Sequence, residues 1–374
     1  MAYLGQMNSY ENTIPDKIMV TDRILNTNPL KIIPYMRLGA DVGKFAFVNM
    51  DGKSYRWLED TYVPESVTET GLTSGTTTTT FTPSSLTFFQ PGDLVRIDDE
   101  VLWVSAVATG IPTVTRGWGD STAATHADNS TALRVGRARI DGDAADSSPM
   151  TEVTSSTNYT QIFQRTIEIA RTKQKSAMYG IADPLGYEID KKMDELLMQL
   201  CKLPYHGQRY VGTNAALARS AGGFRTFITE NSTNVASAAL TRDHIDDLLQ
   251  DIHAEGGDPD LILCGAFGQR KINSFYEGFI TTDRSEALGG NMITKLMNPV
   301  SGSVIDVIAD LHCPAAEMWM LESDKIAFYA FDPFFYEDLG KTGDAVLGEI
   351  VGEYGFVVQA DKHHGFLYGI STSA

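Results

Sequence analysis

An abrupt change of composition divides this 374-residue chain: residues 64–149 are rich in Thr, Ser, Gly and Ala and begin with the low-complexity stretch TETGLTSGTTTTT. Short strand patterns follow in GDLVRI, VLWVSAV, TVTRGW and ALRVG, with turn residues between them. This series predicts a small β-domain. Its expected core comprises the apolar residues of these strands: Leu94, Val95, Ile97, Val101, Leu102, Trp103, Val104, Val114 and Trp118.

Two β-patterned stretches flank this insert, residues 43–63 before it and residues 150–172 after it. The first contains Asp51-Gly52, a strong hairpin-turn signal, and the second alternates isoleucines with polar residues. We expect the two stretches to pair as the outgoing and returning sides of one long projection. Three prolines interrupt residues 1–42, which therefore predict an extended arm.

The clearest helix pattern begins at Asp183, a good N-cap, with Pro184 at the first helical position, and ends before Pro204. Within residues 183–203 the apolar positions repeat on one face: Leu185, Ile189, Met193, Leu196, Leu197 and Leu200. At about 1.5 Å per residue the helix is roughly 30 Å long. It is long enough to support a domain.

A second region of mixed structure begins at Thr241, where TRDHIDDLLQDIHAEGG predicts a capped helix that stops at Gly256-Gly257. LILCG then predicts a buried strand and FGQRKINSFYEGF a helix. Five more segments predict strands: VIDVIA, MWML, IAFYAF, EIVGEYGFVVQA and GFLYGI. This order indicates an α+β fold instead of regular βαβ repetition.

The chain is acidic, with a formal net charge of -18. This charge argues against direct binding of DNA, which needs a basic face. The first residues lack a basic start followed by an apolar run, and no apolar stretch has membrane-spanning length, so we expect a soluble protein without a membrane partner. Cys201, Cys264 and Cys313 are widely separated, and we expect them to be reduced.

No catalytic motif that we sought is complete. Gly340-Lys341-Thr342 is similar to the end of a phosphate-binding loop, but the first glycine of that motif would fall at Phe335. The motifs G-x-S-x-G, H-E-x-x-H and G-x-G-x-x-G do not occur. Two adjacent pairs would diverge on a strand instead of sharing a metal ion: His312-Cys313 and His363-His364. The sequence predicts no catalytic residue, cofactor or metal ion.

Adjacent carboxylates leave one enzymatic alternative open. Asp98, Asp99 and Glu100 are acids of the kind that a hydrolase uses, although their context favours a solvated turn. The aromatic cluster IAFYAFDPFFY is expected in the core or in an interface.

The order of these features resembles the major capsid proteins of tailed bacteriophages with the Hong Kong 97-like fold, over the whole chain. The resemblance is carried by TQIFQRTIEIARTKQKSAMYGI, DPDLILCGAFGQRKINSF, LGKTGD and EYGFVVQADKHHGFLYGI. It implies an α+β subunit with these parts: an N-terminal arm (1–42), an extended-loop hairpin (43–63 and 150–172), an inserted β-domain (64–149), a P-domain (173–224) with spine helix 183–203, an A-domain (225–325), P-domain strands and turn (326–360) and a C-terminal A-domain strand (361–374).

The resemblance also implies a non-enzymatic function. Copies of the chain are expected to form hexamers and pentamers of an icosahedral head shell that encloses double-stranded DNA, assembled in the cytoplasm of the bacterial host and located in the virion capsid. Further implied partners are portal, scaffolding and decoration or cement proteins. The residues expected to contribute to assembly are Lys44, Lys53, Trp57, Leu196, Leu197, Lys341 and Asp344. The lysine-to-asparagine crosslink of the family's founding member has no identifiable acceptor here.

Three alternatives share some of these features. An encapsulin-like compartment has the same fold but encloses protein, and a phage tail or receptor-binding protein would also suit the Thr-rich β-insert. A hydrolase that uses the carboxylates from Asp98 to Glu100 is the third. The particles formed, and their contents, distinguish these alternatives.

Overall fold

The computed structural model describes residues 45–49, 51–72, 75–85, 88–139, 141–142, 151–176, 181, 183–212, 217–275, 295–341 and 343–372. The chain divides into two compact units. The first, which we call the main unit, combines Met1–Trp57 with Ser155–Ala374, and the second, the β unit, is Leu58–Thr154. The predicted arm and Lys44 lie outside the described residues.

Helix α2 (Pro184–His206) begins where the sequence predicts it. The Asp183 side chain caps it by accepting a hydrogen bond from the Leu185 amide at 3.1 Å. The predicted end is wrong, because the helix continues through Pro204 to His206. A proline in the last turn costs one hydrogen bond. Burial of Leu203, Pro204 and Tyr205 offsets that cost.

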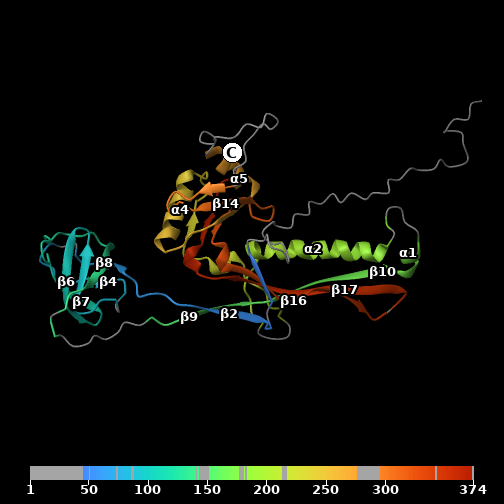
Figure 1. The fold of residues 1–374 in the computed structure, drawn as a ribbon, viewed down its shortest axis with the longest axis horizontal. Helices are drawn as coiled ribbons and strands as arrows, with labels where there is room; N and C mark the ends of the chain where they lie inside the picture. Colours follow the sequence, from blue (N-terminus) through green and yellow to red (C-terminus); the bar gives the residue numbers. More distant parts are fainter. Residues whose placement is uncertain are drawn as a thin grey trace, which may run out of the picture. The chain divides into compact units, whose positions relative to one another are not determined.

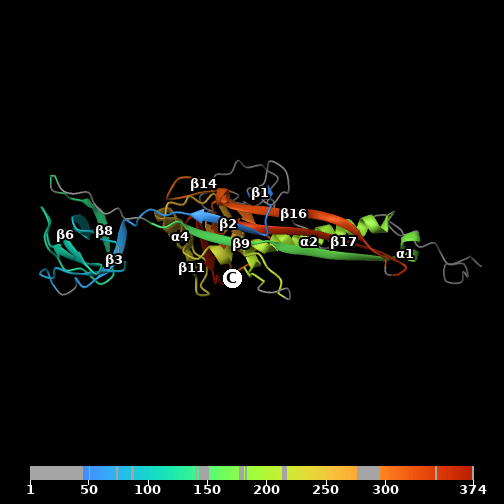
Figure 2. The same cartoon turned by 90° about the horizontal axis from the view of Figure 1, so that it is seen from below.

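The long four-stranded sheet of the main unit has the order β1-β16-β17-β10. Its strands are β1 (Ala46–Asn49), β10 (Gln161–Ala170), β16 (Ile326–Leu339) and β17 (Ala345–Val358). Strand β17 pairs antiparallel with both β16 and β10, whereas β1 runs parallel to β16. Figures 1 and 2 show α2 running along β10 and β17, after the short helix α1 (Arg171–Lys175).

The apolar stripe of α2 packs against this sheet. Leu196 and Leu200 are fully buried in the core of the main unit, and Leu185, Ile189 and Met193 pack at its edge. Leu197 is only half-buried. The stripe is therefore centred on Leu196.

The predicted hairpin of residues 43–63 and 150–172 forms only in part. Strands β2 (Ser54–Glu59) and β9 (Thr154–Tyr159) make a two-stranded sheet, which we call the ribbon. Strand β10, by contrast, pairs over all its residues with β17. This pairing buries Phe163, Ile167 and Ile169, which a two-stranded projection would have left in water.

A second, six-stranded sheet of the main unit has the order β11-β18-β15-β12-β14-β13. Its strands are β11 (Ser232–Asn234), β12 (Leu261–Cys264), β13 (Lys295–Met297), β14 (Val304–Ala309), β15 (Met318–Leu321) and β18 (Gly365–Tyr368). The accompanying helices are α3 (Phe224–Phe227), α4 (Arg242–Ala254), α5 (Ala266–Phe275) and the 3-10 turns η2 (Ser323–Lys325) and η3 (Asp361–His363). Thr241 caps α4 as predicted.

One core joins the two sheets and α2. Phe356 and Val358 of β17, Leu261 of β12 and Leu200 of α2 all belong to it. Since the sequence separation of these residues is large, local patterns do not predict their contact.

The β unit is built on a six-stranded sheet with the order β4-β3-β8-β5-β6-β7. Its strands are β3 (Ser66–Thr70), β4 (Thr82–Pro83), β5 (Asp93–Ile97), β6 (Glu100–Ala108), β7 (Ile111–Thr115) and β8 (Ser130–Arg137). All described pairs in this sheet are antiparallel.

The core of the β unit differs from the predicted one. Val95, Ile97, Leu102, Val104 and Val114 are buried as expected. The prediction is wrong for Leu94, Val101 and Trp103, which are half-buried, and for Trp118, which is exposed. Successive strand residues face opposite sides of a sheet, so these residues lie on its other face. Residues outside the strongest strand patterns complete the core: Leu72, Phe81, Phe88, Phe89 and Ala132.

No helix in the described ranges is both long enough and apolar enough to cross a membrane.

The substitution Leu196→Asp should destabilise the main unit by about 3–5 kcal/mol, because it removes a fully buried side chain and leaves an unpaired charge in its place. The adjacent Leu197→Asp is the matched control and should cost much less. Urea unfolding of the unassembled subunit measures both. Equal losses would show that the apolar stripe is not centred on Leu196.

The β unit has a core of its own, so residues 58–154 expressed alone should fold. We expect dispersed NMR signals and a cooperative melt. Replacing the same residues by a short Gly-Ser linker should leave the main unit folded. A disordered isolated segment, together with a misfolded linker variant, would mean that the two units depend on one core.

Candidate functional site

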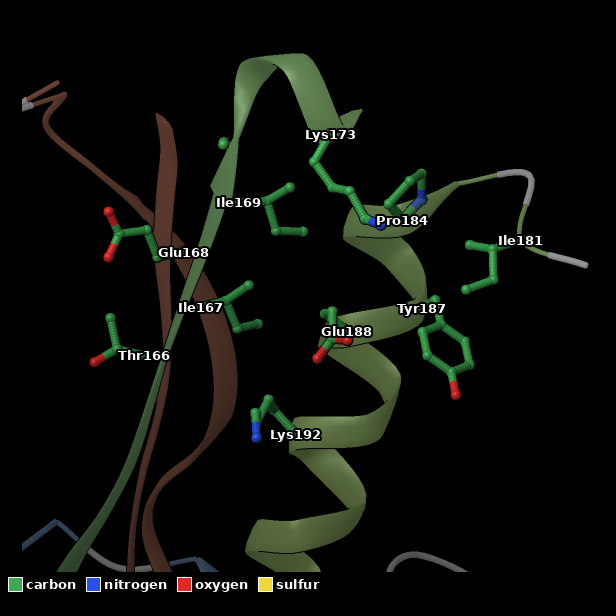
Figure 3. A pocket seen from close by; sticks show the side chains of 11 residues that line it. Thr166, Ile167, Glu168, Ile169, Lys173, Ile181, Pro184, Tyr187, Glu188 and Lys192 are labelled. Carbon is green, nitrogen blue, oxygen red and sulfur yellow. The ribbon is translucent and has the colours of Figure 1, made fainter. Parts of the chain in front are cut away.

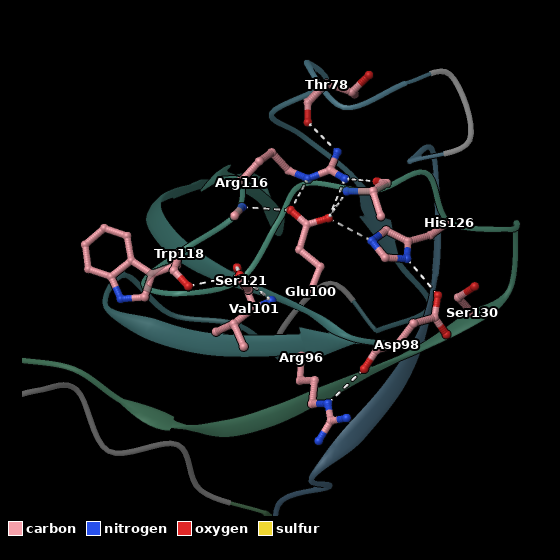
Figure 4. Close-up of polar contacts among 12 residues, drawn as sticks. Thr78, Arg96, Asp98, Glu100, Val101, Arg116, Trp118, Ser121, His126 and Ser130 are labelled. Carbon is pink, nitrogen blue, oxygen red and sulfur yellow. Dashed lines mark hydrogen bonds and ion pairs between the residues drawn. The ribbon is translucent and has the colours of Figure 1, made fainter.

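Of the three acids that left a hydrolase open, Glu100 lies in a buried structural network of the β unit (Figure 4). Glu100 at the start of β6 is almost fully buried. The Arg116 guanidinium donates to both of its carboxylate oxygens, Nε to Oε1 at 2.8 Å and Nη2 to Oε2 at 2.7 Å. The amides of Gly117 and Ala124 donate to the same carboxylate at 2.8 and 2.9 Å.

His126 completes the network between two acids. Its Nε2 lies 3.0 Å from Glu100 Oε2 and its Nδ1 lies 2.7 Å from Asp98 Oδ2. Burial alone would raise the pKa of Glu100, but the hydrogen bonds from Arg116, the Ala124 amide and His126 outweigh it and lower the pKa to about 2. Glu100 is therefore ionised with both oxygens occupied. The arrangement holds the loop 116–126 against β6 and leaves no oxygen of Glu100 free for a substrate.

The third acid of the run, Asp99, is fully exposed and forms a 3.4 Å ion pair with Arg96. Such a surface pair contributes little to stability. The three adjacent carboxylates thus have separate surroundings and do not converge on one point.

A groove of about 520 Å³ lies between β10 and α2 in the main unit (Figure 3). Ile167 and Ile169 point from the strand toward the helix, while Thr166 and Glu168 point the other way. On the helix side, Lys192 is paired with Glu195 at 2.9 Å. The groove is lined by apolar residues such as Ile167 and Ile169 and by the charged residues Lys173, Glu188 and Lys192.

The segment Gly340-Lys341-Thr342 lies between β16 and β17, so no helix follows it as a phosphate-binding loop requires. Lys341 is exposed, and Thr342 lies outside the described residues. Asp344, just before β17, forms an ion pair with Arg171 at the start of α1, with Nε 2.6 Å from Oδ1 and both side chains about two-thirds exposed. The turn closes the end of the long sheet.

The remaining residues expected to act in assembly have different surroundings. Lys53 is exposed, and its carbonyl accepts hydrogen bonds from the Thr160 amide and hydroxyl, both at 3.1 Å. Trp57 is 5% exposed, with its ring edge-on to Phe227 at 5.2 Å. The burial of Trp57 and Leu196 favours a role in folding the subunit.

His364, Cys264 and Cys313 are buried in the main unit. His364 is buried, accepts from the Glu322 amide through Nδ1 and donates to the Gln359 carbonyl through Nε2. Burial lowers the pKa of His364 to about 4. Burial also raises the pKa of Cys264 to about 12 and that of Cys313 still further, so both thiols stay protonated. Within the described ranges no three His, Cys, Asp or Glu side chains are placed to hold a metal ion.

Sequence reasoning missed a polar cluster in the main unit around Glu353. Arg219 forms an ion pair with Glu353, and the Thr160 hydroxyl donates to the same carboxylate. Asn158 joins this region to Gly222, whose amide donates to its side-chain oxygen at 2.8 Å. These partners lie 59 to 193 residues apart in sequence, so no spacing rule could have found them.

The surface carries many large apolar side chains that no part of the described chain covers. The most exposed are Leu58, Tyr62, Val135, Val153, Ile162, Met297, Val304 and Leu311. Isolated cases are normal on a protein surface, but adjacent ones mark interaction surfaces. On Met297 and Val304, which face each other across β13 and β14, more than half of the surface is exposed. These exposed apolar side chains are therefore the candidate contact surfaces of the chain.

Comparison with known proteins identifies the fold and the family. The model of the family described as SU10 major capsid protein matches residues 6–371. No curated protein matches the sequence.

Solved capsid structures are similar over nearly their whole length. The cyanophage A-1(L) capsid asymmetric unit is 13% identical with a TM-score of 0.60, covering 98% of this chain and 100% of that chain. The capsid of a native GTA particle is 11% identical with a TM-score of 0.55, covering 98% and 99%. The capsid of Myoviridae phage XM1 is 11% identical with a TM-score of 0.50, covering 94% and 97%. At such identities the likeness shows the fold alone, which is Hong Kong 97-like.

The family match covers almost all of the sequence. The chain therefore belongs to the SU10-type major capsid proteins, a non-enzymatic family, and functions as the major capsid protein of the icosahedral phage head shell in the virion.

Proposed function

We propose that the subunits group into hexamers and pentamers, that neighbours in the shell overlap through the ribbon, and that the shell encloses double-stranded DNA. The observation that carries the proposal is the exposed apolar surface on and beside the ribbon. Leu58 is 69% exposed, Tyr62 99% and Val153 54%. An isolated two-stranded sheet is marginally stable in water, so a ribbon of this kind gains stability by lying on another subunit.

Overlap between neighbouring subunits explains how a shell can be stable although each contact between two subunits is weak. Once a subunit is held by one neighbour, its contacts with the next neighbours form at a high effective concentration. Exposed charged residues at the far end of the long sheet add a second contact region in this proposal, with Lys341 and Asp344 at its turn. Lys53 and Leu197 are retained as contact residues, while Trp57 and Leu196 support the subunit itself.

The β unit is, in this proposal, the β-domain inserted in the extended loop, on the surface of the shell. Its independent core supports this assignment. In the same proposal the P-domain comprises residues 173–224 and 326–360, and the A-domain comprises residues 225–325 and 361–374. Portal, scaffolding and decoration proteins are the further partners that such a head requires.

DNA is enclosed without sequence-specific contact. The net charge of -18 supports this view, because a shell that bound phosphate tightly would resist the movement of DNA during packaging. The enclosed DNA is then held by closure of the shell.

The double substitution Leu58→Ser and Val153→Ser should leave the subunit soluble and folded but reduce the yield of closed shells at least about tenfold, since it removes apolar contact area. Electron microscopy and sedimentation measure the yield. Ile111→Ser removes a less exposed apolar side chain, 39% exposed at the start of β7, and is the control. Normal shells from the double variant would reject overlap through the ribbon.

Particles purified from infected cells should contain nuclease-protected double-stranded DNA. Particles that contain a protein cargo and no DNA would favour the encapsulin-like alternative. Tail-like structures in place of closed shells would favour a tail or receptor-binding protein.

A further inference from the structure

One face of the β-unit sheet carries apolar side chains that its core does not use. Six residues make up this surface, which we call the tryptophan face: Leu94, Val101, Trp103, Trp118, Leu133 and Val135. Leu94 lies directly opposite Trp103 in the β5–β6 pair. Arg96, two residues further along β5, lies opposite Val101 on one side and Leu133 on the other. The register therefore brings residues from three strands and one loop together.

Trp118 is held rigidly although its side chain is 40% exposed. Its ring stacks on that of Trp103, with centroids 5.0 Å apart and planes at 25°. Its amide donates to the Val101 carbonyl at 2.8 Å, and its carbonyl accepts from the Ser121 hydroxyl at 2.9 Å. Figure 4 shows the indole pointing away from the polar cluster.

The backbone around Trp118 is specialised for this presentation. Gly117 and Gly119 have φ angles of +57° and +68°, a region that other residues rarely adopt. A Cβ on Gly117 would also lie 3.1 Å from the Ala123 amide nitrogen. Arg116, immediately before, is fixed by Glu100. The buried network thus holds Trp118 in a fixed position. Binding of a partner therefore costs little conformational entropy of this side chain.

Charge indicates the kind of partner. Residues 58–154 contain 14 Asp and Glu, 5 Arg and no Lys. Four of the arginines contact other parts of the β unit: Arg116 binds Glu100, Arg137 binds Asp93, Arg96 binds Asp99 and Arg134 lies over the Phe88 ring. Exposed acids lie near the tryptophan face in the sequence or in the sheet, among them Glu65, Asp99 and Asp120.

We propose that the tryptophan face docks a separate virion protein whose contact surface is apolar at its centre and rich in Lys and Arg at its edge. Tryptophan in a rigid, partly exposed position is typical of the residues that dominate binding energy. A second copy of the β unit is excluded as the occupant by charge, because two such acidic surfaces repel each other. The proposal rests on the β unit lying at the surface of the shell.

Site-specific photo-crosslinking in purified virions tests the proposal. A benzoylphenylalanine placed at position 118 should crosslink, on irradiation, to a basic virion protein other than this chain. The same group at position 111, which is exposed at the start of β7, is the control and should give about tenfold less of that product. Mass spectrometry identifies the crosslinked chains.

Two further variants separate apolar docking from charge. Trp118→Ala should reduce the copy number of the crosslinked protein in virions at least about tenfold, and the double variant Asp99→Lys and Asp120→Lys should also reduce it. Crosslinks between copies of this chain, an acidic partner, or no product above the control would each overturn the proposal. Electron microscopy of the same virions shows whether shells are intact, so loss of docking is distinguishable from failure of assembly.

Discussion

The main unit depends on one phenylalanine that contacts three layers at once. The ring of Phe224 lies 5.7 Å from that of Tyr205 in α2, 5.2 Å from Trp319 in β15 and 5.1 Å from Phe356 in β17. Gly223 is needed beside it, because a Cβ there would collide with the carbonyl oxygens of Leu203 and Pro204. Close contact between the end of α2 and this short turn is therefore what lets both sheets share one core. Trp319 extends the cluster by stacking on Phe366 at 3.7 Å.

Local signals in the sequence predict local structure well and distant pairing poorly. Asp183 and Pro184 correctly place the start of α2, and Thr241 that of α4, because a helix cap needs only neighbouring residues. The partner of β10 was predicted incorrectly, since the choice between β2 and β17 depends on a packed helix that alternation cannot reveal. In the β unit the strands were recognised, but Phe81, Phe88 and Phe89 were missed as core residues because they lie in or beside a low-complexity segment. The order of the patterns indicates only an α+β fold, whereas the family resemblance predicts the Hong Kong 97-like fold and the function.

Glu100 is bound on both of its carboxylate oxygens by other parts of the β unit. A carboxylate that accepts hydrogen bonds from one guanidinium, two amides and an imidazole has no free lone pair for a substrate. The residues predicted to act in assembly could not be separated by sequence into buried and exposed ones. Lys53 lies immediately before β2 and Trp57 lies within it, yet Trp57 is buried and Lys53 is exposed. Contact surfaces depend on which side of a strand faces solvent, and that is decided by the whole fold.

The ribbon also determines how the chain responds to force. The two covalent connections between the main unit and the β unit lie in β2 and β9, so a load that pulls on the β unit passes along these two strands. The ribbon is held by hydrogen bonds such as that from Thr154 Oγ1 to the Glu59 carbonyl at 3.2 Å, and each such bond contributes only about 1 kcal/mol. Because Trp57 of β2 is buried against Phe227, tension on this strand also acts on apolar packing in the main unit. The ribbon is thus the part of the chain along which a mechanical load passes between the two folded units.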